Sequence, residues 1–359
     1  MRERPLHGGE DRSAAPVVLD FSVNTNPLGM PPAVRQLLRE ETSLAEQYPD
    51  RTAKALRESL AAKWKVPPEQ ILMGNGASEI LMLAALALAP KEVLIPSPSF
   101  SGYARAFEAA GSAVRYLPLL PEEQFELTER FFAEISCGTG AAVLCNPNNP
   151  TGRAADPDLL TETAKRCEER GITLLLDECF LSFLPDGEAR TFLTRTKEFP
   201  HLLIVRAATK IFALPGLRLG CAVSGNAALL ARMAALQSEW SVSSFAQAAG
   251  LAALADPDWY DATRELVRKE RVYLTEGLAR EGFWVLPGEA NFLLFSAEEA
   301  EEALYEALLL RGIRIRSCSN FRGLGHQNGR SWYRIAVKTR PENEQLIRAI
   351  QEIRHESGI

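Results

Sequence analysis

The chain has 359 residues, of which 46% are hydrophobic and 24% are charged, a composition typical of a globular protein with a large buried core. Its length suggests two domains, although a single α/β body can also hold this many residues. The formal net charge is −6 and no long basic run occurs, which argues against a nucleic-acid partner.

Neither membrane insertion nor metal binding is indicated. The longest apolar stretch, Ile80 to Ala89, is too short to cross a bilayer, and the first five residues lack an apolar signal core, so we expect a cytoplasmic protein. There are only four histidines, and none of the cysteines forms a Cys-x-x-Cys pair, so we expect neither a metal site nor a disulfide framework. The cysteines are Cys137, Cys145, Cys167, Cys179, Cys221 and Cys318.

Apolar runs alternate with helical patterns through the middle of the chain. A helix is predicted from Asp156 to Arg170, with Asp156 as its cap and a proline in its first turn. Continuous apolar strands that alternate with helices indicate a mostly parallel sheet covered on both faces, and ligands bind at the carboxyl ends of such strands. The predicted strands cover residues 93–95, 141–145, 172–176 and 202–205.

The C-terminal part has a different pattern, typical of a small α+β domain. We therefore predict a large domain over residues 41–272, a small one over residues 273–359, and an N-terminal segment, residues 1–40, that packs with the small domain. The strands predicted for the small domain are 291–295, 313–316 and 332–337, and its helices are 297–310 and 341–356.

Three polar segments follow or precede these apolar runs. The segment from Gly74 to Glu79 opens an apolar helix, and the backbone N–H groups at such a start can bind phosphate. The loop from Asn146 to Gly152, Asn-Pro-Asn-Asn-Pro-Thr-Gly, forms an unusual turn that can present the amide of Asn149 to a cleft. Asp177 ends a buried strand, where its carboxylate needs a partner; a helix cap, a metal ligand and the counter-ion of a buried cation all remain possible.

Lys210 lies in an apolar segment with Arg218 eight positions further on (218 − 210). A single lysine is ordinarily a solvated surface side chain. A desolvated lysine near a second cation, however, has a lowered pKa and becomes a nucleophile for carbonyl groups.

Together these segments match the needs of pyridoxal phosphate, whose pyridine ring acts as an electron sink. Lys210 would hold the aldehyde as a Schiff base, Asp177 would keep the ring nitrogen protonated, and Asn149 would donate to the ring hydroxyl. The phosphate would be held by Gly76, Ala77 and Ser78 together with Thr209 and Arg218.

These motifs, in this order, resemble the aspartate-aminotransferase superfamily of fold-type I pyridoxal-phosphate enzymes. The resemblance covers essentially the whole chain, and Tyr48-Pro49-Asp50 with Gly74-Asn75-Gly76 is similar to the histidinol-phosphate aminotransferase branch. It implies a large domain with a mostly parallel seven-stranded sheet. It also implies that Phe100 stacks on the cofactor ring, and that Tyr48 reaches the cofactor of a neighbouring subunit in a homodimer.

Within that branch the chain resembles the threonine-phosphate decarboxylases. The resemblance rests on His7-Gly8-Gly9, the segment from Leu19 to Gly29, the segment from Phe212 to Arg218, and the segment from Arg316 to Phe321. It implies decarboxylation of L-threonine O-3-phosphate to 1-aminopropan-2-ol O-2-phosphate in cobalamin biosynthesis. By the same resemblance, the residues that touch the substrate are Gly8, Gly9, Asn26, Asn149, Arg316 and Arg334.

Three positions depart from the family pattern. Phe180 stands where aminotransferases usually have a tyrosine, Ala207 replaces a hydroxyl residue, and Arg322 replaces a proline. Two alternatives therefore stay open. The first is a histidinol-phosphate aminotransferase that uses 2-oxoglutarate and the same residues. The second is a non-catalytic pyridoxal-phosphate protein, such as the sensor domain of a regulator.

Overall fold

The computed structural model describes residues 8–9, 16–135, 138–297, 301–325 and 330–357, and its largest element is a seven-stranded sheet. The strand order is β2-β8-β7-β6-β5-β3-β4, and only β8 runs antiparallel to its neighbours. The strands are β2 (Ile71–Gly74), β3 (Glu92–Ser97), β4 (Ala113–Pro118), β5 (Thr139–Cys145), β6 (Thr173–Asp177), β7 (Leu202–Ala207) and β8 (Gly220–Ser224).

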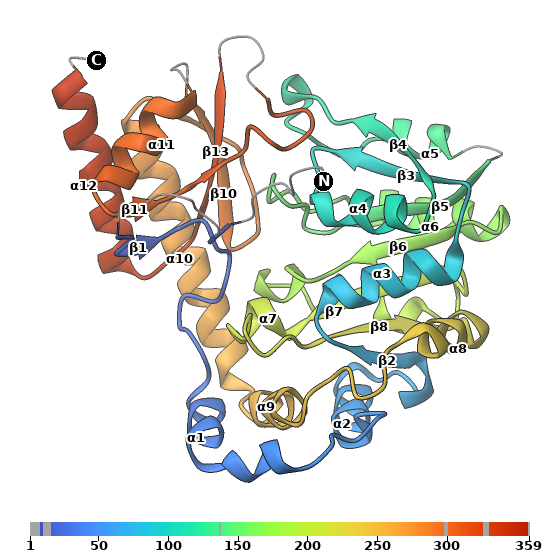
Figure 1. Ribbon diagram of the computed structural model, residues 1–359. Coiled ribbons are helices and arrows are strands. Elements are labelled where there is room, and N and C mark those ends of the chain that lie inside the picture. Colours follow the sequence, from blue (N-terminus) through green and yellow to red (C-terminus); the bar gives the residue numbers. More distant parts are fainter. Residues whose placement is uncertain (1–7, 10–15, 136–137, 298–300, 326–329, 358–359) are drawn as a thin grey trace.

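Helices cover both faces of this sheet, as the continuous apolar strands predict (Figure 1). Along β5, Val143 contributes to one core cluster and Leu144 to the other, so the strand is buried on both sides. The first cluster includes residues of α3 (Ala77–Leu88), α4 (Ser101–Ala109), α8 (Ala227–Leu236) and α9 (Ser244–Leu254). The second includes residues of α2 (Lys54–Trp64), α5 (Arg130–Glu134) and α6 (Pro157–Glu169).

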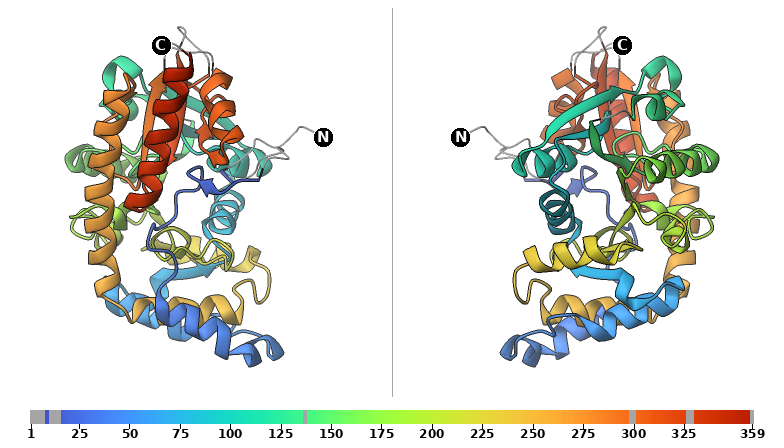
Figure 2. Two further views of the ribbon diagram at one scale, coloured as in Figure 1. Left: turned by 90° about the vertical axis from the view of Figure 1, so that its left-hand side faces the viewer. Right: turned by 90° about the vertical axis from the view of Figure 1, so that its right-hand side faces the viewer.

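A smaller, four-stranded antiparallel sheet lies beside the large one, in the order β12-β13-β10-β9. Its strands are β9 (Trp284–Val285), β10 (Phe292–Ala297), β12 (Arg316–Ser317) and β13 (Ser331–Ala336). The helices of this part are the long α10 (Asp258–Arg280), α11 (Glu301–Leu310) and α12 (Arg340–Ser357), and α12 packs along α10 (Figure 2). The predicted fold, α/β with a mostly parallel seven-stranded sheet and a smaller second sheet, is confirmed.

The N-terminal segment contacts both parts of the molecule. Its strand β1 (Leu19–Asp20) pairs in parallel with β11 (Ile313–Arg314), and its helix α1 (Pro32–Glu40) packs against α9 of the large part (Figure 1). The predicted boundary at residue 272 falls inside the continuous helix α10, and it stays a prediction.

One predicted strand divides in two. Residues 313–316 were expected to form a single strand, but β11 and β12 belong to different sheets. The side chain of Ile315, between them, is buried in the core of the smaller part, and the arginines on either side are half-buried. Among the described residues, no helix is long and apolar enough to cross a membrane.

The carboxyl ends of the parallel strands gather the candidate residues at one edge of the large sheet. Cys145 at the end of β5 is paired with Asp177 at the end of β6, and β7 ends directly before α7 (Ala208–Ile211), which carries Lys210. The segment with Arg218 leads back into β8, whose first residue, Gly220, pairs with both Ala207 and Gly74. The topology therefore brings segments more than 130 residues apart to one place.

Candidate active site

A cavity of about 260 Å³ lies at this edge, between the large sheet and the smaller one. Seven of the predicted site residues line it, and they come from strand ends, helix starts, the N-terminal segment and β13. They are Gly8, Ser78, Phe100, Asn149, Lys210, Arg316 and Arg334. The remaining walls include Ser22, Asn24, Ser101, Phe180, Asn320 and Phe321.

Lys210 lines this cavity and is half-buried. Burial, and to a smaller extent the positive charges of Arg334 and Arg218, lower its pKa to about 8. Its Nζ atom lies 5.7 Å from the centre of the Phe180 ring. A lysine with this pKa is partly neutral near pH 8, so it can act as a nucleophile or accept a proton.

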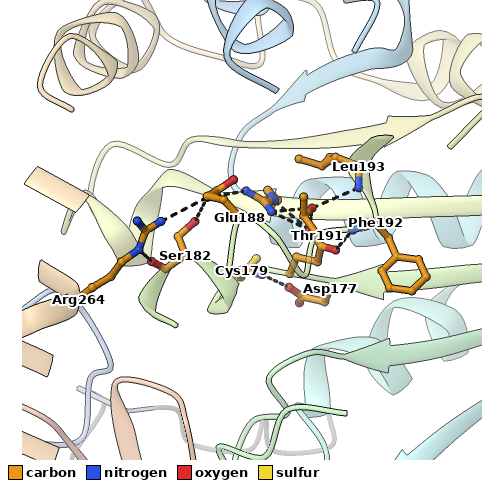
Figure 3. A network of polar contacts seen from close by, with 10 residues as sticks. Asp177, Cys179, Ser182, Glu188, Thr191, Phe192, Leu193 and Arg264 are labelled. Carbon is orange, nitrogen blue, oxygen red and sulfur yellow. Dashed lines mark hydrogen bonds and ion pairs between the residues drawn. The ribbon is translucent and has the colours of Figure 1, made fainter. Parts of the chain in front are cut away.

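Two adjacent acidic residues, Asp177 and Glu178, have different surroundings. Glu178 is buried and pairs with Arg206, with Nη2 2.8 Å from Oε2, and it also accepts hydrogen bonds from Thr191 and the backbone of Phe192. Asp177 is only 6% exposed, yet no cation among the described residues forms an ion pair with it. Figure 3 shows Asp177 joined to Cys179, apart from the network around Thr191 and Glu188. Glu178 is therefore structural, and Asp177 retains capacity for a further donor.

Arg334 is held rigidly in the wall of the cavity. Its Nη1 donates to Asn149 Oδ1 at 2.6 Å, and its Nη2 donates to the backbone oxygen of Ser22 at 2.8 Å. The amide of Asn24 lies against the same guanidinium, where its oxygen can accept at 3.2 and 3.3 Å. Burial, together with the charge of Arg316, lowers the pKa of Arg334 to about 10. Among the described residues no carboxylate neutralises Arg334, so a bound anion would stabilise its charge.

The start of α3 is arranged as an anion site. Gly76 precedes this helix with a positive φ of 77°, and no side chain caps the helix. A Cβ atom on Gly76 would stand 2.5 Å from Nη2 of Arg218, so glycine is needed for Arg218 to lie against this turn. Ser78 in the first helical turn faces the cavity. These features suit a phosphate group.

The comparisons with known proteins agree with this geometry. Residues 16–350 match the family described as aminotransferase class I and II. The chain is 37% identical to a threonine-phosphate decarboxylase from Salmonella typhimurium, over 97% of this chain and 96% of that protein. The chain belongs to the class I and II aminotransferase family.

Solved structures of proteins with two different activities resemble this chain. A histidinol-phosphate aminotransferase from Clostridium acetobutylicum has a TM-score of 0.88 and 31% identity, over 94% of this chain and all of that one. An L-threonine-O-3-phosphate decarboxylase from Porphyromonas gingivalis has a TM-score of 0.84 and 26% identity, with the same coverage. The protein is accordingly a pyridoxal-phosphate-dependent enzyme of the aminotransferase class I and II family.

The residues present fit that cofactor. Asp177 is a buried carboxylate without a cation, as a protonated pyridine nitrogen requires. The turn at Gly76 with Arg218 suits the phosphate, and Lys210 suits the aldehyde. Asn149 uses its amide oxygen for Arg334, which leaves its NH2 group to donate to the ring oxygen.

Phe180 lies in the cavity wall, with its ring edge to face against that of Phe292, at 78° between the planes. A tyrosine here could donate a hydrogen bond, but phenylalanine offers only an apolar surface beside Lys210. Ala207 lies at the end of β7 and does not line this cavity. Arg322 stacks on Tyr116 at 4.2 Å and lines a neighbouring cavity of about 460 Å³.

Asn26 lies away from the cavity, although the family resemblance predicts that it touches the substrate. Its Nδ2 donates to Ile211 O and to Thr263 Oγ1, both at 2.7 Å, and its Oδ1 accepts from the backbone of Leu28. With all these groups engaged, Asn26 anchors the N-terminal segment behind Lys210. The structure thus corrects this prediction in favour of Asn24, two residues earlier, which does line the cavity.

Gly8 touches the cavity and Gly9 does not, although Gly9 donates its N–H to Ser22 Oγ. A Cβ atom on Gly8 would stand 2.1 Å from the backbone oxygen of Ser22, so only glycine fits there. His7 lies outside the described residues. Tyr48 lies on the surface, away from the cavity of its own chain, and is 80% exposed.

Sequence reasoning missed two further residues, Asn24 and Tyr103. The signal for Asn24 was its place in the segment Ser-Val-Asn-Thr-Asn, but sequence alone could not decide which asparagine faces the cavity. Tyr103 lies three residues after Phe100, one helical turn away, and its hydroxyl donates to Asp177 Oδ2 at 2.7 Å.

Proposed function

We propose that the enzyme decarboxylates L-threonine O-3-phosphate to (R)-1-aminopropan-2-ol O-2-phosphate and CO2, as a cytoplasmic step of cobalamin biosynthesis. The observation that carries the proposal is the pair Arg316 and Arg334, which line the same cavity as Lys210. The substrate has one carboxylate and one phosphate, and the planar fork of arginine suits both groups. The 37% identity to a threonine-phosphate decarboxylase supports this reading.

Arg334 would bind the α-carboxylate, and Arg316 the phosphate. The bond to Cα that breaks is the one perpendicular to the cofactor ring, because only its electrons overlap with the ring π system. Arg334 is fixed by Asn149 and Ser22, so it can hold the carboxylate in one orientation and select that bond. When bound, pyridoxal phosphate supplies the electron sink for the pair left on Cα.

The remaining chemistry belongs to Asp177 and Lys210. Asp177 stabilises positive charge at the ring nitrogen, in a buried setting where such an interaction is strong. Lys210, with a pKa of about 8, can deliver a proton to Cα after CO2 has left. The Phe180 ring beside it has no exchangeable proton, so it cannot compete in this transfer.

The alternative is a histidinol-phosphate aminotransferase, and the likeness to the Clostridium acetobutylicum structure favours it. The same residues would then hold the substrate with hydrogen, rather than the carboxylate, perpendicular to the ring. The two activities differ in whether the enzyme needs 2-oxoglutarate as a second substrate.

The test is an assay of purified enzyme, loaded with pyridoxal phosphate, on both substrates. We expect CO2 from threonine phosphate in the absence of 2-oxoglutarate, and no turnover by the Lys210→Ala variant. Turnover of histidinol phosphate alone, dependent on 2-oxoglutarate, would establish the alternative. Persistent lysine-linked cofactor absorbance in Lys210→Ala would remove Lys210 from its assigned role.

The proposal includes a homodimer in which Tyr48 reaches the phosphate of the partner subunit's cofactor. Tyr48 packs on Trp240, with ring centres 4.5 Å apart, and Trp240 is itself 42% exposed. Two adjacent exposed aromatic rings are expected at a subunit interface rather than in water.

A further inference from the structure

Tyr103 connects two residues of the cofactor site without reaching the cavity. It lies in the first turn of α4, is 1% exposed, and does not line the cavity. Its hydroxyl donates to Asp177 Oδ2 at 2.7 Å, while Asp177 Oδ1 accepts from the backbone N–H of Cys179 at 2.9 Å. Each carboxylate oxygen of Asp177 is therefore oriented by one donor.

The hydrogen bond from Tyr103 has a fixed direction. Burial, reinforced by the negative charge of Asp177, raises the pKa of Tyr103 well above its ordinary value, so the phenol stays protonated. The thiols of Cys145 and Cys179 are kept neutral in the same way, because burial and Asp177 raise their pKa. Tyr103 is therefore the donor, and the Asp177 carboxylate the acceptor, of a charge-assisted hydrogen bond.

The ring of Tyr103 also supports Phe100. The two rings meet edge to face, with centres 5.5 Å apart and planes at 85°. Phe100 is the residue that precedes α4 and lines the cavity, and Tyr103 follows it by one helical turn. One turn of α4 therefore sets both the stacking ring and the orientation of Asp177.

We infer that Tyr103 is a positioning residue for the cofactor: its hydroxyl fixes the orientation of the Asp177 carboxylate that would hold the ring nitrogen, and its ring supports Phe100. This rests on the cofactor assignment in the proposed function but not on which bond breaks. Tyr103→Phe removes only the hydroxyl and keeps the edge-to-face contact. Without this donor only the backbone N–H of Cys179 would orient Asp177, so the carboxylate would stabilise positive charge at the ring nitrogen less well.

The experiment compares wild type and Tyr103→Phe by the dissociation constant of pyridoxal phosphate and by titration of the bound cofactor's absorbance. We expect a dissociation constant about tenfold higher, in line with the loss of a hydrogen bond to a charged group. A less positive ring withdraws fewer electrons from the nitrogen linked to Lys210, so its absorbance should titrate at higher pH than in wild type. The kcat should fall more than KM changes, because Tyr103 does not touch the cavity.

Tyr260→Phe is the matched control, since Tyr260 is a buried tyrosine outside this site. It should leave the cofactor titration and dissociation constant unchanged. If Tyr103→Phe loses only thermal stability and keeps the wild-type titration and affinity, Tyr103 is merely structural and the inference is overturned. If wild type itself shows no lysine-linked cofactor band, the proposed function fails instead, so the two failures are distinguishable.

Discussion

At the scale of single residues, the environment of Lys210 decides its reactivity. Its pKa is lowered to about 8 mainly by burial, against an ordinary value near 10.5. The amine is therefore neutral at a pH where a surface lysine is still charged. Phe180 lines the cavity beside this amine. Because it has no hydroxyl, it adds no second acid–base group there.

The pH dependence of cofactor capture tests this environment. The cofactor-free enzyme should react with pyridoxal phosphate at a rate that rises about tenfold per pH unit below pH 8 and levels off above it, because only the neutral amine attacks. Stopped-flow absorbance measures the rate. A rate that keeps rising toward pH 10 would mean that Lys210 has an unperturbed pKa.

Variants of Asn24 and Asn26 should separate an effect on substrate binding from an effect on the free energy of unfolding. Asn24→Ala should raise KM for threonine phosphate with little change in the free energy of unfolding, because its side chain faces the cavity and Arg334. Asn26→Ala should lower the free energy of unfolding by about 1–3 kcal/mol, because it leaves the buried Ile211 carbonyl without its donor. Steady-state kinetics and urea unfolding of both variants check this, and the reverse pattern would restore Asn26 to the substrate site.

At the scale of elements, the residues at strand ends could be predicted from the sequence, whereas the segments that pass between sheets could not. Lys210, Asp177 and Asn149 follow apolar runs, so their convergence at one sheet edge follows from parallel strands alone. The break at Ile315 could not be foreseen, because its local pattern suits one strand and the division depends on two separate partners, β1 and β13. The pairing of Glu178 with Arg206 also needed the fold, since 28 residues separate them.

That buried pair links Glu178, directly after β6, to Arg206 near the end of β7. Arg206→Leu should lower the free energy of unfolding by about 3–5 kcal/mol, because Glu178 would remain buried without its cation. Glu162→Gln, which removes a half-exposed partner of Arg166, is the control and should cost about 0.5 kcal/mol or less. Urea unfolding of the cofactor-loaded proteins measures both; equal costs would mean that burial does not set the strength of the pair.

At the scale of the whole molecule, the cavity depends on several distant segments. The N-terminal segment supplies Gly8, Ser22 and Asn24, the helix α7 that follows β7 supplies Lys210, and β13 supplies Arg334. Motifs in the sequence predicted these regions. Which of Asn24 and Asn26 faces the cavity, however, depends on how the N-terminal segment crosses between the two parts. Tyr48 would extend the same site across two subunits.

Mixed dimers test the contribution of Tyr48. Subunits carrying Lys210→Ala should be inactive, and subunits carrying Tyr48→Ala should bind the cofactor weakly. In a hybrid dimer one of the two sites has Lys210 from one subunit and Tyr48 from the other, so activity should return to about half that of wild type per dimer. If hybrids are no more active than the Tyr48→Ala dimer, Tyr48 acts within its own chain or not at all.

The bond broken at Cα is the central claim, and the fate of the Cα hydrogen tests it most directly. L-Threonine O-3-phosphate deuterated at Cα should give CO2 and a product that retains the deuterium at C1 together with one proton from water, as measured by NMR and mass spectrometry. Loss of the deuterium to solvent, with formation of a 2-oxo acid and no CO2, would contradict the assignment of Arg334 and establish transamination.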